Sequence, residues 1–259
     1  MWGKQIKPDP QPLRPLLEAA VAEGYGMVEW RSPTRDGITV PASDLLERPE
    51  AAVQIRELGQ ELGLGLSYHA PQGPSWQFGV LAPELAESRL RECVRRAASI
   101  GARLVTLHLG VAVGEGRDSS IRQGARICQC VAQYAEDHGI QLSIENVYEE
   151  HSVATVSECQ LLFECADDPR IGLTLDTGHA HLCGCLHEMA RCLPDRLAFT
   201  HIHDNDLTDD VHLAPGHGTI DWPLLIADLE AASYTGPLSF ELREEARLCD
   251  LIATWRHSR

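Results

Sequence analysis

Short apolar runs alternate with longer amphipathic stretches along most of the chain. Eight of these runs have the length of a buried strand, at residues 4–7, 27–30, 64–69, 104–108, 141–145, 171–176, 197–203 and 238–241. The stretches between them place apolar residues at helical spacing, most clearly over 83–100 and 121–135. The pattern therefore predicts eight strands that alternate with helices.

Glycines and one capping motif mark the ends of the predicted helices. Gly24, Gly63, Gly101 and Gly139 recur at intervals of 38 or 39 residues, each after a helix-like stretch and before an apolar run. Glycine suits this place because the residue that ends a helix often adopts a left-handed conformation. The segment 155–158 (TVSE) has the form of a capping box, which indicates a helix start. A repeat of this length is typical of a βα unit.

Eight such units fit the length of the chain. Eight strands and their helices in 259 residues predict a single (β/α)8 TIM barrel. We expect residues 1–259 to form one domain, because no linker or composition break interrupts them. A doubly wound open sheet is the alternative, but it would usually carry a glycine-rich phosphate turn after an early strand, and none is present.

Metal-binding residue types stand at the ends of six successive predicted strands: His69, His108, Glu145, Asp176, His201 and Glu241. The carboxyl ends of barrel strands meet at one rim, where active sites are built. Burying carboxylates and imidazoles without partners is costly, and a divalent metal would satisfy both. A structural network of hydrogen bonds could account for one strand end, but hardly for the whole rim.

Further candidate ligands lie near this rim. His179 follows the strand that ends at Asp176, and Asp210 and His212 lie in the loop after the seventh strand. Two residues that are two positions apart can point the same way in an extended segment. Nitrogen and carboxylate donors suit zinc, manganese, iron or cobalt. The cysteines do not fall at the rim, which argues against a thiolate site.

Composition bears on partners and location. The formal charge of −16 repels nucleic acid and argues modestly against a DNA substrate. The chain has no apolar run of about 18 residues and no apolar signal core at its N-terminus, so we expect no membrane segment and a cytoplasmic protein. Nine cysteines then indicate reduced thiols rather than disulfides. Formation of a homodimer is compatible with the sequence.

Several short motifs make the pattern specific: HAP at 69–71, the strand-end His108, IEN at 144–146, LDTGHA at 175–180, HIHDND at 201–206, DVHLAPGHGTIDW at 210–222 and FELR at 240–243. On these motifs, residues 24–243 resemble the xylose isomerase-like TIM-barrel superfamily. That group includes sugar and sugar-phosphate isomerases and epimerases, and the endonuclease IV type of apurinic-site nuclease. The resemblance implies a metal-dependent enzyme with one to three divalent ions, zinc first among them.

In the nuclease branch, nine residues bind three metals, and each has a counterpart here. The resemblance implies one ion held by His69, His108 and Glu145. A second ion would share Glu145 and be held also by Asp176, His201 and Glu241. A third would be held by His179, Asp210 and His212.

In the epimerase branch, only the central four residues bind metal, namely Glu145, Asp176, His201 and Glu241. By that resemblance Glu145 and Glu241 are the catalytic acid and base on opposite faces of the substrate, and His179 contacts the substrate.

Some positions leave alternatives open. His201 and His203 are two apart on a strand and share a face, and we favour His201 as the ligand because its His-x-x-Asp spacing matches the family. His203 then supports a ligand or contacts substrate. Trp76 could wall the pocket, and Arg243 could meet a phosphate or form a salt bridge. Glu29, at the end of the second strand, could orient a rim residue.

The chain departs from both branches. The nucleases carry an aromatic wedge just after the first site histidine, whereas the aromatic residues here stand further on, at Trp76 and Phe78. The epimerases place an arginine about six residues after the metal-binding histidine, where this chain has Leu207.

Three hypotheses follow. The first is an isomerase or epimerase of a small sugar or sugar phosphate, in which a metal polarises substrate oxygens and a carboxylate moves the proton. The second is a hydrolase of phosphodiesters, in DNA or in smaller molecules, that uses three clustered metals. The third is a non-catalytic barrel that binds sugar or metal. The complete carboxylate pair argues against the third hypothesis, and the acidity and altered loop argue against the second.

Overall fold

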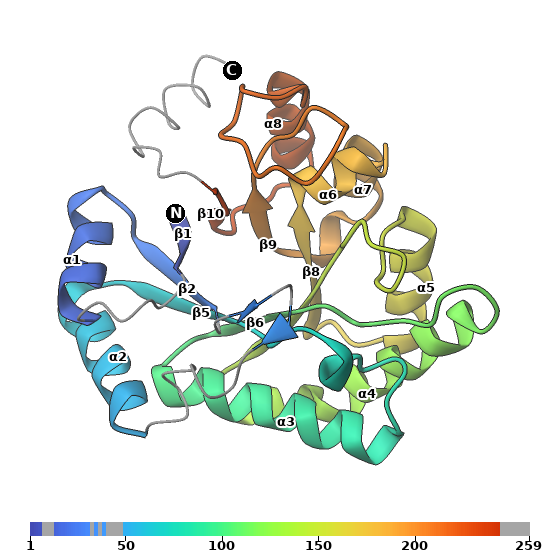
Figure 1. The fold of residues 1–259 in the computed structure, drawn as a ribbon, viewed down its shortest axis with the longest axis horizontal. Helices are drawn as coiled ribbons and strands as arrows, with labels where there is room; N and C mark the ends of the chain where they lie inside the picture. Colours follow the sequence, from blue (N-terminus) through green and yellow to red (C-terminus); the bar gives the residue numbers. More distant parts are fainter. Residues whose placement is uncertain (7–12, 32–33, 36–37, 40–48, 244–259) are drawn as a thin grey trace.

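Eight parallel strands close into a barrel in the computed structural model, which describes residues 1–6, 13–31, 34–35, 38–39 and 49–243. Around the barrel the strands follow the order β1-β10-β9-β8-β7-β6-β5-β2. β1 (Trp2–Ile6) pairs with both β2 (Met27–Arg31) and β10 (Leu238–Phe240). The first and last strands therefore lie side by side and close the sheet (Figure 1).

The remaining barrel strands are β5 (Gly65–His69), β6 (Leu104–Leu107), β7 (Gln141–Glu145), β8 (Ile171–Asp176) and β9 (Leu197–Ile202). The predicted (β/α)8 barrel is thus confirmed, and the open-sheet alternative is wrong because the sheet has no free edge. The first strand begins two residues earlier than predicted, and Lys7 lies outside the described residues. β2 extends one residue further, to Arg31. A short antiparallel hairpin, β3 (Thr34–Arg35) with β4 (Ile38–Thr39), is not evident from the sequence pattern.

Helices surround the strands in Figure 1. They are α1 (Leu13–Ala22), α2 (Pro49–Leu62), α3 (Pro83–Ile100), α4 (Arg117–Asp137), α5 (Val156–Ala166), α6 (Thr177–Leu182), α7 (Leu186–Cys192) and α8 (Trp222–Ala231), with short 3-10 helices at Pro74–Trp76 and Pro194–Arg196. The four recurring glycines have φ between 67° and 93°, the left-handed conformation predicted for them. Within the described part of the chain, every helix is too short or too polar to cross a membrane.

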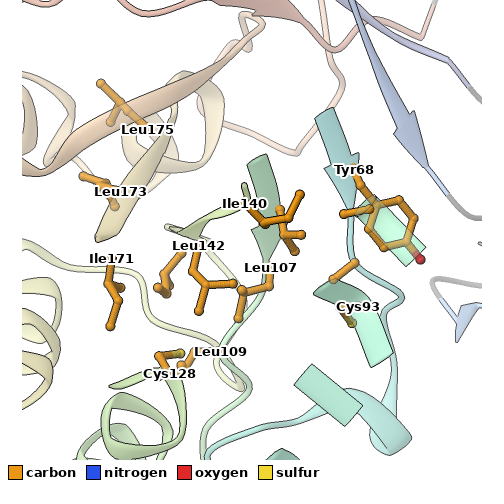
Figure 2. Close-up of a cluster of buried hydrophobic side chains, with 14 of the residues drawn as sticks. Tyr68, Cys93, Leu107, Leu109, Cys128, Ile140, Leu142, Ile171, Leu173 and Leu175 are labelled. Carbon is orange, nitrogen blue, oxygen red and sulfur yellow. The ribbon is translucent and has the colours of Figure 1, made fainter. Parts of the chain in front are cut away.

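The hydrophobic core lies between the strands and this outer layer of helices. Figure 2 shows Leu107, Leu142 and Leu173 from three neighbouring strands, together with Cys93 of α3 and Cys128 of α4. All five side chains are buried. Burial raises the pKa of the Cys128 thiol to about 12, so this cysteine behaves as an inert packing group. Each fully buried leucine contributes roughly 1.5–3 kcal/mol. The core therefore holds the strand ends in fixed register at the rim.

A capping box begins α5, as the sequence predicts. The hydroxyl of Thr155 accepts a hydrogen bond from the backbone N–H of Glu158 at 3.3 Å. The Glu158 carboxylate accepts in return from the N–H of Thr155 at 3.1 Å and of Ala154 at 2.8 Å. Arg117, the first residue of α4, also donates to Glu158, at 2.5 Å. One carboxylate thus joins the starts of two adjacent helices.

Replacing Thr155 with alanine should lower the free energy of unfolding by about 1 kcal/mol, because an N–H at the start of α5 loses its acceptor. Thr155→Ser keeps the hydroxyl and serves as the matched control. Chemical denaturation followed by circular dichroism measures both variants. Equal losses in the alanine and serine variants would show that the cap does not act through its hydrogen bond.

Candidate metal centre

The rim of the barrel gathers the predicted residues from six strands. The donors come from the ends of β5, β7, β8 and β9 and from the residues just after β6 and β10: His69, Glu145, Asp176, His201, His108 and Glu241. Donor atoms of Glu145, Asp176, His201 and Glu241 lie within 4.8 Å of one another, and so do those of His69, His108 and Glu145. We call these the central cluster and the first cluster. Glu145 belongs to both.

Glu145 is the shared residue of the two clusters and is 1% exposed. Its Oε2 lies 3.1 Å from Nε2 of His69 and 3.1 Å from Nε2 of His108, and its Oε1 lies 3.1 Å from Nδ1 of His201. Burial would raise the pKa of Glu145, but His201 and His108 outweigh it and hold that pKa well below its usual range. The carboxylate at the centre of the site is therefore ionised.

His201 lies between four carboxylates. Its Nδ1 is 3.1 Å from Glu145, 3.2 Å from Glu241 and 3.8 Å from Asp176. Its Nε2 is 2.8 Å from Oε2 of Glu29, which is fully buried in the middle of β2. Burial would lower the pKa of His201, but Glu29 and Glu145 raise it well above its usual value. Glu29 thus orients a rim residue.

Arg31 is a site residue that the sequence pattern did not reveal. Its Nη1 donates to Oε1 of Glu241 at 2.6 Å and to Gln5 at 3.1 Å, and its Nη2 donates to Gln72 at 2.9 Å. Burial would raise the pKa of Glu241, but Arg31 and His201 hold it below its usual range. The available signal was the position of Arg31 directly after the apolar run 27–30, one residue beyond the predicted strand end.

A third cluster lies beside the central one and contains four residues: His179, His203, Asp210 and His212. His179 comes from α6, His203 follows β9 directly, and the other two belong to the loop after β9. The donor atoms of all four are within 4.8 Å of one another. Burial would lower the pKa of His179, but Asp176 and Asp210 raise it to about 10.

His203 does not contact the pocket surface, because its side chain is fully buried. Its Nε2 lies 2.9 and 3.1 Å from the two carboxylate oxygens of Asp176. Of the two roles that the sequence left open, support of a rim carboxylate therefore agrees with the geometry and substrate contact does not. The ring also stacks on His212, with centroids 4.1 Å apart.

Five of the six histidines in the clusters share one arrangement. In each ring, one nitrogen points toward the other donor atoms of its cluster. The second nitrogen lies near an oxygen that is not a donor of that cluster; for His203 this oxygen belongs to Asp176. The pairs are His69 with Ala70 O at 2.9 Å, His201 with Glu29 at 2.8 Å, His179 with Asn146 O at 3.1 Å, His203 with Asp176 at 2.9 Å and His212 with Glu241 O at 2.8 Å. Histidines that bind metals almost always donate their other N–H to such an oxygen.

The donor chemistry fits a divalent cation. When the ring is neutral, an outer N–H on oxygen leaves the lone pair of the inner nitrogen facing the buried carboxylates, and a divalent ion between them would take the place of the proton. Within the described residues, Nδ1 of His203 and Oδ1 of Asp210 are buried and have no hydrogen-bond partner, although they lie 3.8 Å apart. Imidazole and carboxylate donors without thiolate match the zinc, manganese, iron or cobalt sites expected from the sequence.

A pocket of about 670 Å³ opens above the clusters. Glu145, Glu241 and His179 line its floor or walls, and so do two of the other predicted substrate contacts, Trp76 and Arg243. Trp76 is buried beneath the guanidinium of Arg89, and Arg243 donates to the backbone oxygen of Asp210 at 2.9 Å. Tyr148 also lines the pocket, and its ring lies 5.3 Å from that of His179.

A family model described as xylose isomerase-like TIM barrel matches residues 17–258. The chain belongs to the xylose isomerase-like TIM-barrel family. The match covers all three clusters and every barrel strand except β1, so the resemblance noted in the sequence is confirmed.

Proteins that resemble the chain carry different names. An inosose isomerase of Halalkalibacterium halodurans is 25% identical over 120 residues, which cover 43% of each protein. A probable endonuclease 4 of Listeria welshimeri is 28% identical over 141 residues, or 47% of this chain and 45% of that protein. The matched segments thus span less than half of either relative. The crystal structure of a D-tagatose 3-epimerase-like protein superposes with a TM-score of 0.81 at 19% identity, over 100% of this chain and 97% of that one.

Asp176→Ala should remove the ion of the central cluster, because the substitution deletes one of four donors at a buried site. Metal content per chain, measured by elemental analysis after gel filtration, should fall by one ion relative to the unsubstituted protein. Asp206→Ala is the matched control, since that exposed carboxylate lies outside the three clusters and bonds to Thr208 of its own loop. Unchanged metal content in Asp176→Ala would show that the assignment is wrong.

Proposed function

We propose that this protein is a divalent-metal-dependent isomerase or epimerase of a small sugar or sugar phosphate. The observation that carries the proposal is the placement of two carboxylates in one small pocket. Glu145 and Glu241 both line the pocket of about 670 Å³, and both lie against Nδ1 of His201, at 3.1 and 3.2 Å. This volume falls in the range of roughly 300–1,000 Å³ that is typical of small-molecule sites.

The central cluster would hold the metal through Glu145, Asp176, His201 and Glu241. When bound, a divalent ion supplies a Lewis acid for the carbonyl and hydroxyl oxygens of the substrate. Asp176 is held for this role by the backbone N–H of His179 at 2.7 Å and by His203 at 2.9 Å. Glu29 fixes the ring of His201 through its Nε2, so that its Nδ1 faces Glu145 and Glu241.

Two carboxylates move the proton in the proposed reaction. Both are ionised, because neighbouring cationic groups keep the pKa of Glu145 and of Glu241 low, so each can accept a proton from a carbon next to a carbonyl. Return of that proton by the same carboxylate to the neighbouring carbon gives an isomer. An epimer forms when the other carboxylate, having first taken a proton from water, delivers it to the opposite face of the same carbon. Arg31 holds Oε1 of Glu241, which leaves Oε2 turned toward His201.

The pocket walls suit a polyhydroxylated molecule. Tyr148 offers a phenol hydroxyl and Arg243 a guanidinium at the rim, while Trp76 provides an apolar face. Small-molecule sites typically combine apolar and aromatic side chains with a few placed polar groups, and this pocket has both. The inosose isomerase among the relatives and the epimerase-like structure support this substrate class.

A second candidate is hydrolysis of a phosphodiester, and one observation favours it. The three clusters contain ten donor residues, with Glu145 shared between two clusters, and nine of the ten are the residues that the nuclease resemblance implies. Clustered metals can activate water and stabilise the leaving oxygen of a phosphoryl transfer. The probable endonuclease 4 among the relatives agrees with this candidate. The formal charge of −16 opposes binding to DNA.

Glu241→Gln should keep much of the metal affinity, because the amide oxygen can still coordinate, and should lose most turnover, because an amide does not accept a proton at neutral pH. A loss of about 10²–10⁴-fold is expected for a general acid–base step. Turnover is followed by NMR in D₂O with D-tagatose and inosose, where deuterium should enter the carbon next to the carbonyl. Glu149→Gln, which changes a pocket carboxylate outside the clusters, is the control. Full activity in Glu241→Gln contradicts the assigned role.

Duplex DNA with one abasic site tests the second candidate. The proposed isomerase should leave this DNA uncut at every salt concentration. Strand cleavage by the metal-loaded protein, with binding that weakens steeply as salt rises, would establish the phosphodiesterase instead, since phosphate contacts release counterions. A gel assay between 50 and 200 mM salt, the range over which such binding typically falls, separates the two outcomes. The Asp176→Ala variant controls for a contaminating nuclease.

A further inference from the structure

The third cluster carries more donors than the family resemblance implies. Three residues, His179, Asp210 and His212, are the implied set, and the structure places His203 against them. Nδ1 of His203 lies 3.8 Å from Oδ1 of Asp210. On the other oxygen of Asp210, Nε2 of His212 lies at 2.9 Å and Nε2 of His179 at 3.6 Å. One carboxylate therefore faces three imidazole nitrogens.

The hydrogen bonds of His203 determine which of its nitrogens is available. Both oxygens of Asp176 lie within 3.1 Å of Nε2, and a carboxylate accepts hydrogen bonds, so Nε2 carries the hydrogen. In the neutral ring Nδ1 then presents its lone pair. That atom is buried, and within the described part of the chain it has no hydrogen-bond partner, like the oxygen of Asp210 that it faces. Two buried acceptors that face each other are unfavourable unless a cation lies between them.

The imidazoles of His179 and His212 are also held by hydrogen bonds through the nitrogen that points away from the cluster. Nδ1 of His179 lies 3.1 Å from the backbone oxygen of Asn146, and Nδ1 of His212 lies 2.8 Å from that of Glu241. Backbone oxygens only accept, so both inner Nε2 atoms are left with lone pairs in the neutral rings. Each of the three rings is therefore oriented by a hydrogen bond from its outer nitrogen to an oxygen. The inner nitrogen of each ring takes no part in that hydrogen bond.

Local backbone features also hold His203 and His212 in place. A Cβ at position 178 would lie 2.0 Å from Cε1 and 2.3 Å from Nδ1 of His203, so the ring occupies space that only glycine leaves open. His212 has φ of +48°, a conformation that non-glycine residues seldom adopt and that usually indicates a constraint. Two hydrogen bonds between Asp204 and Leu213, at 2.8 and 2.9 Å, close the loop that carries Asp210 and His212.

We propose that His203 is the fourth ligand of a coordinatively closed divalent-cation site, with His179, Asp210 and His212, and that its ion joins the loop after β9 to α6 without contacting substrate. Structural zinc sites have four protein ligands, whereas catalytic sites keep one position for water or substrate. Three ligands alone would leave that position open, and His203 fills it. The inference does not rest on the proposed isomerase activity.

The site can be studied alone in a Glu145→Ala background, because Glu145 is the residue common to the other two clusters and is not one of these four donors. The metal-free protein is titrated with Co²⁺, whose visible spectrum reports its coordination, and inorganic phosphate is then added. We expect one ion per chain with the strong absorption of four-coordinate cobalt and no change on addition of phosphate. A phosphate-induced change would show an open position and overturn the inference without any substitution at His203.

Substitution of His203 tests its role as a ligand directly. In the same background, His203→Ala should weaken Co²⁺ binding by more than about 100-fold, since loss of a residue that merely supports a ligand typically costs 10–100-fold. Gly178→Ala should also weaken binding, because its methyl group would displace the ring. His181→Ala is the matched control, since that α6 histidine bonds Thr219 outside the clusters. Unchanged affinity in His203→Ala would refute the fourth ligand.

Hydrogen exchange over residues 205–213 provides a second readout. In the protein that retains His203, adding metal should slow hydrogen exchange in this loop, because the ion would connect the loop to α6. In His203→Ala, adding metal should leave the exchange rate unchanged. Equal exchange with and without metal in the protein that retains His203 would contradict the structural role. None of these measurements uses turnover, so a failure of the isomerase proposal would leave their outcome unaffected.

Discussion

The carboxylate of Glu145 is the constraint on which the site depends, because it is ionised and buried at the mouth of the barrel. An uncompensated buried charge is strongly destabilising, and removing one partner of a buried pair leaves such a charge. Three imidazoles, from the ends of three other strands, supply the compensation at 3.1 Å: His69, His108 and His201. These three strands must therefore end at the same height along the barrel as the strand of Glu145. The site forms only when the barrel does.

The same requirement extends outward in two directions. On one side, two residues of β2 contact the central cluster. The buried carboxylate of Glu29 contacts His201, and the guanidinium of Arg31 contacts Glu241. On the other side, the carboxylate of Asp176 accepts a hydrogen bond from Nε2 of His203, and Nδ1 of the same ring faces Asp210. Each of the three clusters is thereby connected to the next through one shared or hydrogen-bonded carboxylate. The arrangement positions the donors before any ion binds, which lowers the cost of ordering them.

The sequence pattern predicted the features that depend on local periodicity, namely the strands and the residues at their ends. A parallel strand ends where an apolar run changes to polar residues, so the six rim donors and the barrel itself could be inferred from eight such changes. Arg31 could not be inferred in the same way, because its partner Glu241 is 210 residues away and is adjacent only after β1 closes the sheet between β2 and β10. His203 was visible, but its direction depends on the missing side chain at Gly178 and on the loop that follows β9. These are tertiary contacts without a periodic signal in the sequence.

We propose that this rim is a metal centre organised around Glu145. Anomalous diffraction from crystals of protein purified without chelator and supplied with zinc, recorded on both sides of the zinc absorption edge, tests it most directly. We expect an anomalous peak among Glu145, Asp176, His201 and Glu241, at about 2.0–2.2 Å from each donor atom. A map without a peak there, or with Nδ1 of His201 still directly hydrogen-bonded to Glu145 in the zinc-supplied protein, would contradict it.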